Sequence, residues 1–295
     1  MIIVLGSINV DQVYQVDQLP KPGETRMGHG YLQVPGGKGG NQALAARRAG
    51  SEVIMLGAVG DDANREVALS LLEQDEVNVV GVKTTNLPTG SASIWVDDSA
   101  ENSIIVNGGA NNLVTADQLR DTPLSEGDFL ALQMEIPQEE VIKAAAIAKE
   151  YGAKTVLNLA PYAPMDRSAF ANIDYLIVNE TEATNLVTHL GGAAAEMRDK
   201  CFYLSEELHV TCILTLGDKG VFYTMGTEII HINAMRVKAV DTTAAGDCFT
   251  GYFTAALDQQ KPLNHAVIYA TKGAGLACMR AGAQSSIPWA ENVDL

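Results

Sequence analysis

Residues 238–253 read Lys-Ala-Val-Asp-Thr-Thr-Ala-Ala-Gly-Asp-Cys-Phe-Thr-Gly-Tyr-Phe, and this stretch decides the fold that we expect. The alternating segment before it, residues 235–240, predicts a strand that ends at Asp241. Apolar residues then return at helical spacing from Phe249 onward, which predicts a helix after a short turn. The segment therefore predicts a strand, a tight turn of small residues and a helix.

The small residues of this turn predict an anion-binding site. Ala244, Ala245 and Gly246 carry little side chain, so an anion can approach the unpaired N–H groups at the positive end of the helix. Asp247 follows in the first turn, where its carboxylate could accept a proton. An anion site beside a proton acceptor suits phosphoryl transfer to a hydroxyl group. An acidic helix start with small residues for packing is the alternative, and this pattern alone leaves both open.

The composition is that of an ordinary globular protein with an acidic surface. A chain of 295 residues with 47% hydrophobic content can bury a large core, as one domain or as a domain with a small appendage. The formal charge of −16 disfavours a nucleic-acid partner, which requires clustered basic residues. We find no secretory signal and no apolar run of ~20 residues, so we expect no membrane association. Four cysteines without metal-binding spacing predict reduced thiols in a cytoplasmic protein.

The N-terminal third alternates between core segments and β-rich excursions. Residues 1–6 form an apolar run typical of a strand buried on both faces of a parallel sheet. Asn9 and Asp11 follow that strand, at the edge where such sheets bind ligands, and are candidates for holding hydroxyl groups. A turn-forming pair is the alternative for them. Residues 12–35 and 87–108 lack helical spacing, and we expect them to pair into a small β lid over the site.

A second small-residue motif opens a helix. Residues 35–42 read Pro-Gly-Gly-Lys-Gly-Gly-Asn-Gln, and the predicted helix ends at Gly50. The glycines permit a close approach of backbone to ligand, and Lys38 and Asn41 add donors for a polar substrate. A flexible connection is the alternative for a glycine cluster. The motif is neither a Walker A loop nor a dinucleotide fingerprint, which disfavours a nicotinamide oxidoreductase.

The chain after residue 110 shows regular alternation of strands and helices. Strands are predicted at 129–133, 155–158, 175–178 and 212–216, and helices near 138–151, 181–190, 193–207 and 266–277. This alternation predicts an α/β fold, a doubly wound three-layer α/β/α core with a mainly parallel sheet. The core would comprise residues 1–11, 36–86 and 109–295. Polar residues recur at or just after strand ends, where ligands bind: Glu135, Asn179, Glu182, Thr215 and Gly217.

These motifs, in this order, resemble those of the PfkB or ribokinase family of carbohydrate kinases, and within it most closely the ribokinases. The resemblance spans nearly the whole chain and is carried by residues 6–11, 36–42, 179–182, 241–247 and 282–284. It implies the Rossmann-like ribokinase fold with a β-sheet lid. It also implies transfer of the γ-phosphoryl group of ATP to a sugar hydroxymethyl group, with the 5-hydroxyl of D-ribose as the expected acceptor.

The resemblance implies a role for each matching residue. Asp247 would be the catalytic base, and the amides of Ala244 to Gly246 would form the anion hole. The sugar would be held or covered by Asn9, Asp11, Gly37, Lys38, Asn41, Ala92, Ile94, Glu135 and Asp247. The Mg²⁺ and phosphate region would be served by Asn179 and Glu182, and the nucleotide by Thr215 and Gly217. A monovalent cation, K⁺, would lie at Asp241, Thr243, Ala277, Arg280, Gly282 and Ser286.

The resemblance has one departure and leaves alternatives. The broad family usually has glycine where this chain has Ala244, whose methyl group would narrow the anion hole. Members of the subfamily form homodimers through their lids, and we expect the same here. Another kinase of the family, for a different sugar, deoxyribose or a nucleoside, is the main alternative, and an inactive sugar-binding protein is a weaker one. Asn9, Asp11, Lys38 and Asn41 favour a small polyhydroxylated sugar, because a nucleobase would leave their hydrogen bonds unpaired.

Overall fold

Two β-sheets organise the chain in the computed structural model, which describes residues 1–99 and 101–293. Residue 100 of the predicted lid and residues 294–295 of the predicted core lie outside the described residues. The larger sheet has nine strands, in the spatial order β13 (Glu228–Ile232), β12 (Val221–Met225), β11 (Thr211–Thr215), β10 (Tyr175–Asn179), β9 (Lys154–Asn158), β8 (Phe129–Leu132), β1 (Ile2–Leu5), β4 (Val53–Gly60) and β5 (Val82–Thr85). The smaller sheet has four, in the order β3 (Gly30–Gly36), β2 (Asn9–Val16), β6 (Gly90–Asp97) and β7 (Asn102–Asn107).

The larger sheet is parallel from β5 to β11, and only β12 and β13 pair antiparallel at its edge. All four residues of β1 are fully buried, as expected for a central strand covered on both faces. Along β1, Ile2 and Val4 point into one hydrophobic cluster, and Ile3 and Leu5 point into another. The predicted two-sided parallel core is therefore confirmed.

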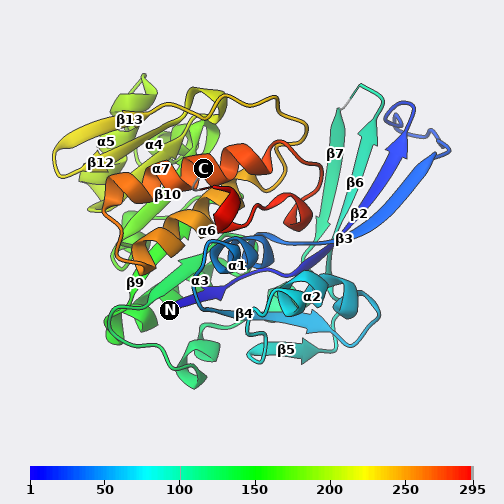
Figure 1. Ribbon diagram of the computed structural model, residues 1–295, viewed down its shortest axis with the longest axis horizontal. Helices are drawn as coiled ribbons and strands as arrows, with labels where there is room; N and C mark the ends of the chain where they lie inside the picture. Colours follow the sequence, from blue (N-terminus) through cyan, green and yellow to red (C-terminus); the bar gives the residue numbers. More distant parts are fainter. Residues whose placement is uncertain (100, 294–295) are drawn as a thin grey trace.

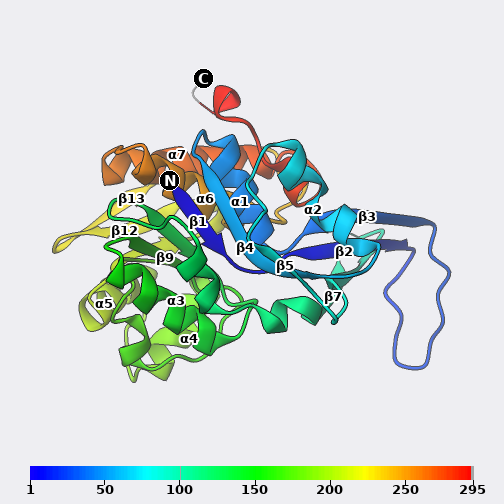
Figure 2. The ribbon, with the colours of Figure 1, turned by 90° about the horizontal axis from the view of Figure 1, so that it is seen from below.

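Helices form a layer on each face of this sheet (Figure 2). One layer contains α1 (Lys38–Arg48), α2 (Asn64–Gln74), α6 (Ala245–Asp258) and α7 (Leu263–Ala277). The other contains α3 (Gln138–Glu150), α4 (Glu180–His189) and α5 (Met197–Leu208). Among the described residues no helix is long and apolar enough to span a membrane.

The smaller sheet projects from one end of the core, beside α1 and α2 (Figure 1). Its strands lie within or near the predicted lid ranges, but β2 begins at Asn9 and β3 runs on to Gly36. Asn9 and Asp11 are therefore not on the core sheet; they belong to the strand that leaves it. The position of the sheet agrees with a lid, since its inner end joins the core at the start of α1.

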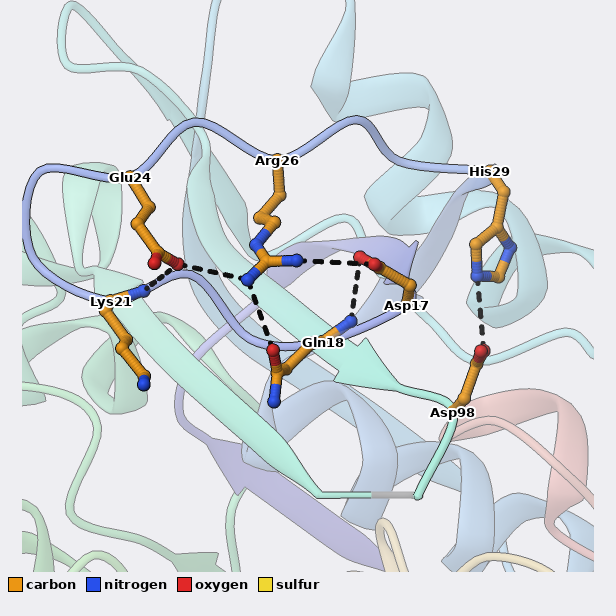
Figure 3. A network of polar contacts seen from close by, with 7 residues as sticks. All are labelled: Asp17, Gln18, Lys21, Glu24, Arg26, His29 and Asp98. Atoms are coloured by element: carbon orange, nitrogen blue, oxygen red, sulfur yellow. Dashed lines mark hydrogen bonds and ion pairs between the residues drawn. The ribbon is translucent and has the colours of Figure 1, made fainter.

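The long loop between β2 and β3 has a defined course (Figure 3). The guanidinium of Arg26 donates to Asp17 at 3.3 Å and to Glu24 at 3.2 Å. His29 lies 3.3 Å from Asp98, which follows β6, so this contact connects the two hairpins of the sheet. These groups are mostly exposed, and exposed ion pairs stabilise little. The contacts therefore shape the loop more than they stabilise the sheet.

One predicted strand is wrong. Residues 233–239 have no regular secondary structure, and the sheet ends at β13. Five residues of this segment line a cavity against α6 and α7: Ala234, Met235, Arg236, Val237 and Ala239. The segment therefore forms a wall of this cavity and not a strand of the sheet. The sequence also gave no sign of β5, β12 or β13.

Candidate active site

The start of α6 presents free N–H groups to open space. The first helical bond is donated by Cys248 to Ala244, so the N–H groups of Gly246 and Asp247 precede it and have no carbonyl partner within the helix. A side chain added at Gly246 would meet nothing within 4 Å. The N–H of Ala245 donates to the carbonyl of Thr242 at 3.2 Å. Of the three amides predicted to bind an anion, Gly246 is thus the most available.

Ala244 holds the cap position of α6 with a backbone φ of 58°, in the left-handed region. This conformation favours glycine, because a Cβ atom there crowds the following carbonyl oxygen. The difference from the usual family pattern therefore lies at a position that adds backbone strain.

Asp247 is 4% exposed, and amide donors hold both of its carboxylate oxygens. Asn41 Nδ2 donates to Oδ2 at 2.9 Å, and Gln42 Nε2 donates to Oδ1 at 3.0 Å. Gln133, which follows β8, donates from Nε2 to Oε1 of Gln42 at 2.8 Å. The predicted base is therefore fixed by side chains from α1 and, through one of them, by the end of β8.

The glycine motif lets α1 start against the end of β1. Gly37 has a φ of 85°, and a Cβ atom there would lie 2.7 Å from the backbone nitrogen of Asn9. A Cβ atom at Gly39 would lie 2.7 Å from the backbone nitrogen of Ser7. Real Cβ atoms do not approach so closely, so these positions require glycine for a tight, ordered approach. The alternative of a flexible connection does not fit this packing.

Asn9 and Asp11 lie side by side on the inner end of β2, and both are buried. The Oδ1 atom of Asn9 accepts a hydrogen bond of 2.7 Å from Asn111 Nδ2. The carboxylate of Asp11 lies against the backbone of Gly36, where any side chain would overlap it. Ala92 on β6 is the register partner of Asp11 and is buried beside it. Four residues predicted to contact the sugar or shape its site, Asn9, Asp11, Gly37 and Ala92, therefore meet at one place.

Glu135, Lys38 and Ile94 complete the predicted sugar set. The Oε2 atom of Glu135 accepts from Ser7 Oγ at 2.6 Å and from the backbone N–H of Lys38 at 3.0 Å. This carboxylate therefore ties the end of β1 to the start of α1. Ile94 lies further out on β6, half-buried and paired in register with Val13.

The carboxylates of this site interact strongly. Burial, with the neighbouring charges of Glu135 and Asp247, raises the pKa of Asp11 to about 7, against the opposing effect of Lys38. The nearby Asp247 carboxylate, with Glu135 and others, raises the pKa of Lys38 despite its burial. A single ammonium group thus offsets the repulsion among several acidic side chains.

A cavity of about 640 Å³ lies on the other side of Asp247, between α6, α7 and the segment after β13. Its lining includes Asn179, Thr215 and Gly217, three of the four residues predicted to serve the nucleotide and its phosphates. Ala245 and Gly246 also line it, so the free N–H end of α6 opens into this space. A cavity of this size accommodates a ligand as large as a nucleotide.

Asn179 and Glu182 form a reciprocal cap at the start of α4. The N–H of Asn179 donates to Glu182 Oε2 at 2.8 Å, and the N–H of Glu182 donates to Asn179 Oδ1 at 2.9 Å. Burial raises the pKa of Glu182, whose carboxylate also interacts with the charges of Lys38 and Asp247. Among the described residues no three His, Cys, Asp or Glu side chains gather as a metal site. Glu182 is the one of the four residues predicted for the nucleotide and its phosphates that does not line the cavity, and it adjoins the cavity through its cap partner Asn179.

The residues predicted for a monovalent cation lie in two segments that the structure joins. Gly282 N–H donates to Asp241 Oδ2 at 2.9 Å, and Thr243 N–H donates to Asp241 Oδ1 at 2.8 Å. Burial acts to raise the pKa of Asp241, but these hydrogen bonds outweigh it and hold the pKa below its usual value. The carbonyl of Ala277 accepts from Arg280 N–H, and the buried Ser286 hydroxyl donates to the carbonyl of Ala283.

Sequence reasoning missed several groups that complete the site. Gln42 was visible in the glycine motif but received no role, and Gln133 and Asn111 were not considered. A buried glutamine directly after a strand, two residues before the candidate Glu135, was the available signal for Gln133. For Asn111 the signal was an amide in a glycine-rich segment that closes the lid sheet.

Comparisons with known proteins agree with this arrangement. Residues 1–290 match the pfkB family of carbohydrate kinases. The ribokinase of Haemophilus influenzae is 37% identical over 289 residues, covering 97% of this chain and 94% of the relative. The crystal structure of a ribokinase from Thermotoga maritima superposes with a TM-score of 0.93 at 36% identity, covering 99% of this chain and 97% of that one. An Arabidopsis thaliana ribokinase complexed with ribose and ATP gives a TM-score of 0.88 at 28% identity, with 99% and 96% covered.

Proposed function

This chain belongs to the pfkB family of carbohydrate kinases, and from that premise we propose that it transfers the γ-phosphoryl group of ATP to the 5-hydroxyl of D-ribose. The observation that carries the proposal is the position of Asp247. Its buried carboxylate belongs to a cluster of buried hydrogen-bonding groups, and the residue directly before it, Gly246, lines a cavity of about 640 Å³ at the free N–H end of α6. A sugar on one side and a nucleotide on the other would place acceptor hydroxyl and donor phosphate together.

Asp247 acts as the base in this reaction. Asn41 and Gln42 donate hydrogen bonds to its two oxygens and so hold the carboxylate in one orientation. As the sugar oxygen attacks the γ-phosphorus, the hydroxyl proton moves to this carboxylate. A positioned general base contributes about 10²–10⁴-fold to a rate.

The start of α6 stabilises the charge on the transferring group. The unpaired N–H groups, that of Gly246 foremost among the predicted Ala244 to Gly246 set, and the helix dipole both favour an anion there. Lys38, on the sugar side, adds a positive charge close to Asp247. Bound Mg²⁺ would supply further neutralisation of the phosphates, and Asn179 and Glu182 would hold its water ligands.

The chemistry of the sugar side supports a small polyhydroxylated substrate. Asn9 and Asp11 on β2, Lys38 and Asn41 on α1, and Glu135 after β8 supply amides, carboxylates and an ammonium group. Hydroxyl groups both donate and accept, so a sugar can satisfy all of these groups at once. An apolar or planar substrate would leave them unpaired, at a cost of about 1–3 kcal/mol for each buried group. The relative from Arabidopsis, solved with ribose and ATP, agrees with this choice.

The remaining parts of the proposal concern the lid, the cation and the state of the protein. Residues 12–35 and 87–108 act as a lid, with Ala92 and Ile94 over the sugar. The exposed apolar side chains of its outer strands, Tyr31, Leu32, Ile104, Ile105 and Val106, support a homodimer formed through the lids. K⁺ binds between the segments joined by Asp241 and Gly282. Four free thiols support a cytoplasmic location.

The test is ADP release from Mg-ATP with a panel of D-ribose, 2-deoxyribose, fructose and adenosine, each with and without K⁺. We expect turnover with ribose, faster in the presence of K⁺, and phosphate on the 5-hydroxyl by NMR of the product. Turnover with another member of the panel but not with ribose would overturn the substrate. Ribose binding without any ADP release would favour an inactive sugar-binding protein. A molecular mass of one chain in solution would overturn the dimer.

A further inference from the structure

Two buried glutamines lie next to the candidate base, and the mechanism described above uses only the hydrogen bond from one of them, Gln42. Gln42 and Gln133 are both fully buried. They connect in one direction: Gln133 Nε2 donates to Gln42 Oε1, and Gln42 Nε2 donates to Asp247 Oδ1. These two hydrogen bonds form a line of three side chains, from Gln133 after β8, through Gln42 on α1, to Asp247 in the first turn of α6.

The direction of this line follows from the chemistry of its end. An ionised carboxylate only accepts hydrogen bonds, so Gln42 must turn its NH₂ group toward Asp247. Its oxygen then faces Gln133, which must in turn present an NH₂ group. Each amide is thus held in one of its two orientations by the next group. If either amide flipped, an oxygen would face an oxygen.

The far end of the line argues against a purely structural role. The Oε1 atom of Gln133 is buried without a hydrogen-bond partner among the described residues. It lies against the backbone of Gly6, where a side chain would overlap it. A buried unpaired acceptor costs about 1–3 kcal/mol, and an apolar side chain of the same shape would avoid that cost. Retention of the amide therefore suggests a task other than stability.

We propose that Gln133 and Gln42 are positioning residues that fix Oδ1 of Asp247 and direct its Oδ2 toward the substrate hydroxyl. Oδ2 is the oxygen that Asn41, a candidate sugar ligand, also contacts, so it lies on the sugar side. With Oδ1 held from the interior, the carboxylate cannot rotate, and the proton is accepted at Oδ2. This inference rests on the proposed function, because it assigns the arrangement that makes Asp247 an effective base.

Other groups also surround the base. The charged groups that interact with Asp247 from other elements are Lys38, Asp11 and Glu182, with the Cys248 thiol on its own helix. Substitution of either glutamine leaves all four in place.

The experiment compares Gln133→Met, Gln42→Met and the double variant with the wild-type protein. Methionine keeps the length of glutamine and removes the amide. Gln118→Met is the matched control: Gln118 is also a buried glutamine, but its Nε2 donates to the backbone carbonyls of Gly57 and Gly81, away from the site. Steady-state kcat and KM for ribose, ribose binding by calorimetry and Tm are measured for each protein.

We expect Gln133→Met and Gln42→Met each to lower kcat about tenfold, because the base is less well oriented. Ribose affinity should change less than threefold. The double variant should lose no more than Gln42→Met alone, because the two residues act in series. The control should lower Tm at least as much as Gln133→Met and leave kcat unchanged.

If the fall in kcat of the double variant equalled the product of the two single falls, the two glutamines would act independently, which would overturn the series arrangement. An unchanged kcat in Gln133→Met would overturn the positioning role of that residue. A fall in Tm without a fall in kcat would assign it to structure alone. The wild-type protein is assayed first: if it shows no sugar-dependent ADP release, the proposed function fails, whereas normal wild-type turnover with unaffected variants removes only the present inference.

Discussion

The two sides of Asp247 are built in different ways. On the sugar side, buried polar side chains such as Asn9, Asp11 and Asn41 point into the site, and hydrogen bonds already hold several of them. On the nucleotide side, an open cavity of about 640 Å³ is lined largely by small, apolar or backbone groups, Gly217, Gly246 and Gly275 among them. The sugar side therefore selects by paired hydrogen bonds, and the nucleotide side by shape and by the end of a helix.

This difference predicts how each side responds to change. A side that depends on preset charges and hydrogen bonds should be sensitive to the loss of one polar group and to pH. A side that depends on shape should tolerate most polar changes and respond to added volume. The predictions below test this contrast, from the largest expected effect to the smallest.

Among the changes that affect one side alone, the largest effect should come from removing the ammonium group of Lys38 on the sugar side. Lys38→Met leaves Asp11, Glu135 and Asp247 without their common counter-charge. We expect kcat/KM for ribose to fall at least about 100-fold, which corresponds to about 2.7 kcal/mol, with KM for ATP changed much less. Lys143→Met, which removes an exposed lysine on α3, is the control and should have no effect. A loss of less than fivefold would show that the acidic cluster does not depend on this charge.

The next effect concerns pH. The pKa of Asp11 is raised to about 7, so the folded protein binds this proton more tightly than the unfolded chain, and stability falls as pH rises from about 4 to 7. Asp11→Asn removes this dependence. At pH 8 it should raise the free energy of unfolding by on the order of 2 kcal/mol, while ribose affinity falls about tenfold. Denaturant unfolding of both proteins at pH 5 and pH 8 measures the gain.

An equal effect of Asp11→Asn on stability at both pH values would contradict the raised pKa. A rise in the free energy of unfolding at pH 5 but not at pH 8 would mean that the pKa of Asp11 is lowered in the folded protein.

A smaller effect, on the other side, should come from added volume. Gly275 lines the cavity on α7, and a Cβ atom there would lie 3.1 Å from Cβ of Met235. Gly275→Val narrows the cavity and should raise KM for ATP about tenfold. Ribose affinity, measured without nucleotide, should remain within twofold and serves as the internal control. Weaker ribose binding with an unchanged KM for ATP would assign this cavity to the sugar and not to the nucleotide.

The smallest effect lies at the junction of the two sides. Ala244 has a φ of 58°, which a methyl group disfavours. Ala244→Gly should raise the free energy of unfolding by about 0.5 kcal/mol, since relief of strain exceeds the added flexibility of the unfolded chain. Ala245→Gly, one residue later and inside the helix, should lower it by about 0.5–1 kcal/mol. Thermal unfolding of the two variants measures these changes. A change of the same sign in both would refute the backbone strain at Ala244.

The same contrast explains how far the sequence could predict the molecule. The core was predictable because buried parallel strands appear as short apolar runs, such as residues 1–6, and the helices between them as longer segments with helical spacing of apolar residues. Most of the polar sugar side was visible as named side chains in motifs, such as Asn9 and Lys38. Which of these groups touch one another depends on tertiary packing, so the Gln133 to Gln42 connection was out of reach.

The nucleotide side was harder to predict because much of its wall consists of apolar side chains and glycines, although Asn179 and Thr215 were visible in motifs. Met235, Val237 and Ala239 alternate like a strand, and only the packed structure reveals that they line a cavity. The left-handed conformation of Ala244 was also hidden, because alanine rarely adopts it and local sequence gives no sign of it.

The central claim, that Asp247 is the base at the meeting point of the two sides, is tested most directly with Asp247→Asn. Ribose binding by calorimetry and ribose-dependent ADP release are measured on the same preparation beside the wild-type protein. We predict that ribose affinity stays within about tenfold while kcat falls about 10³-fold, because the variant keeps the shape of the side chain but not its basicity. Turnover within tenfold of the wild-type rate would contradict the account.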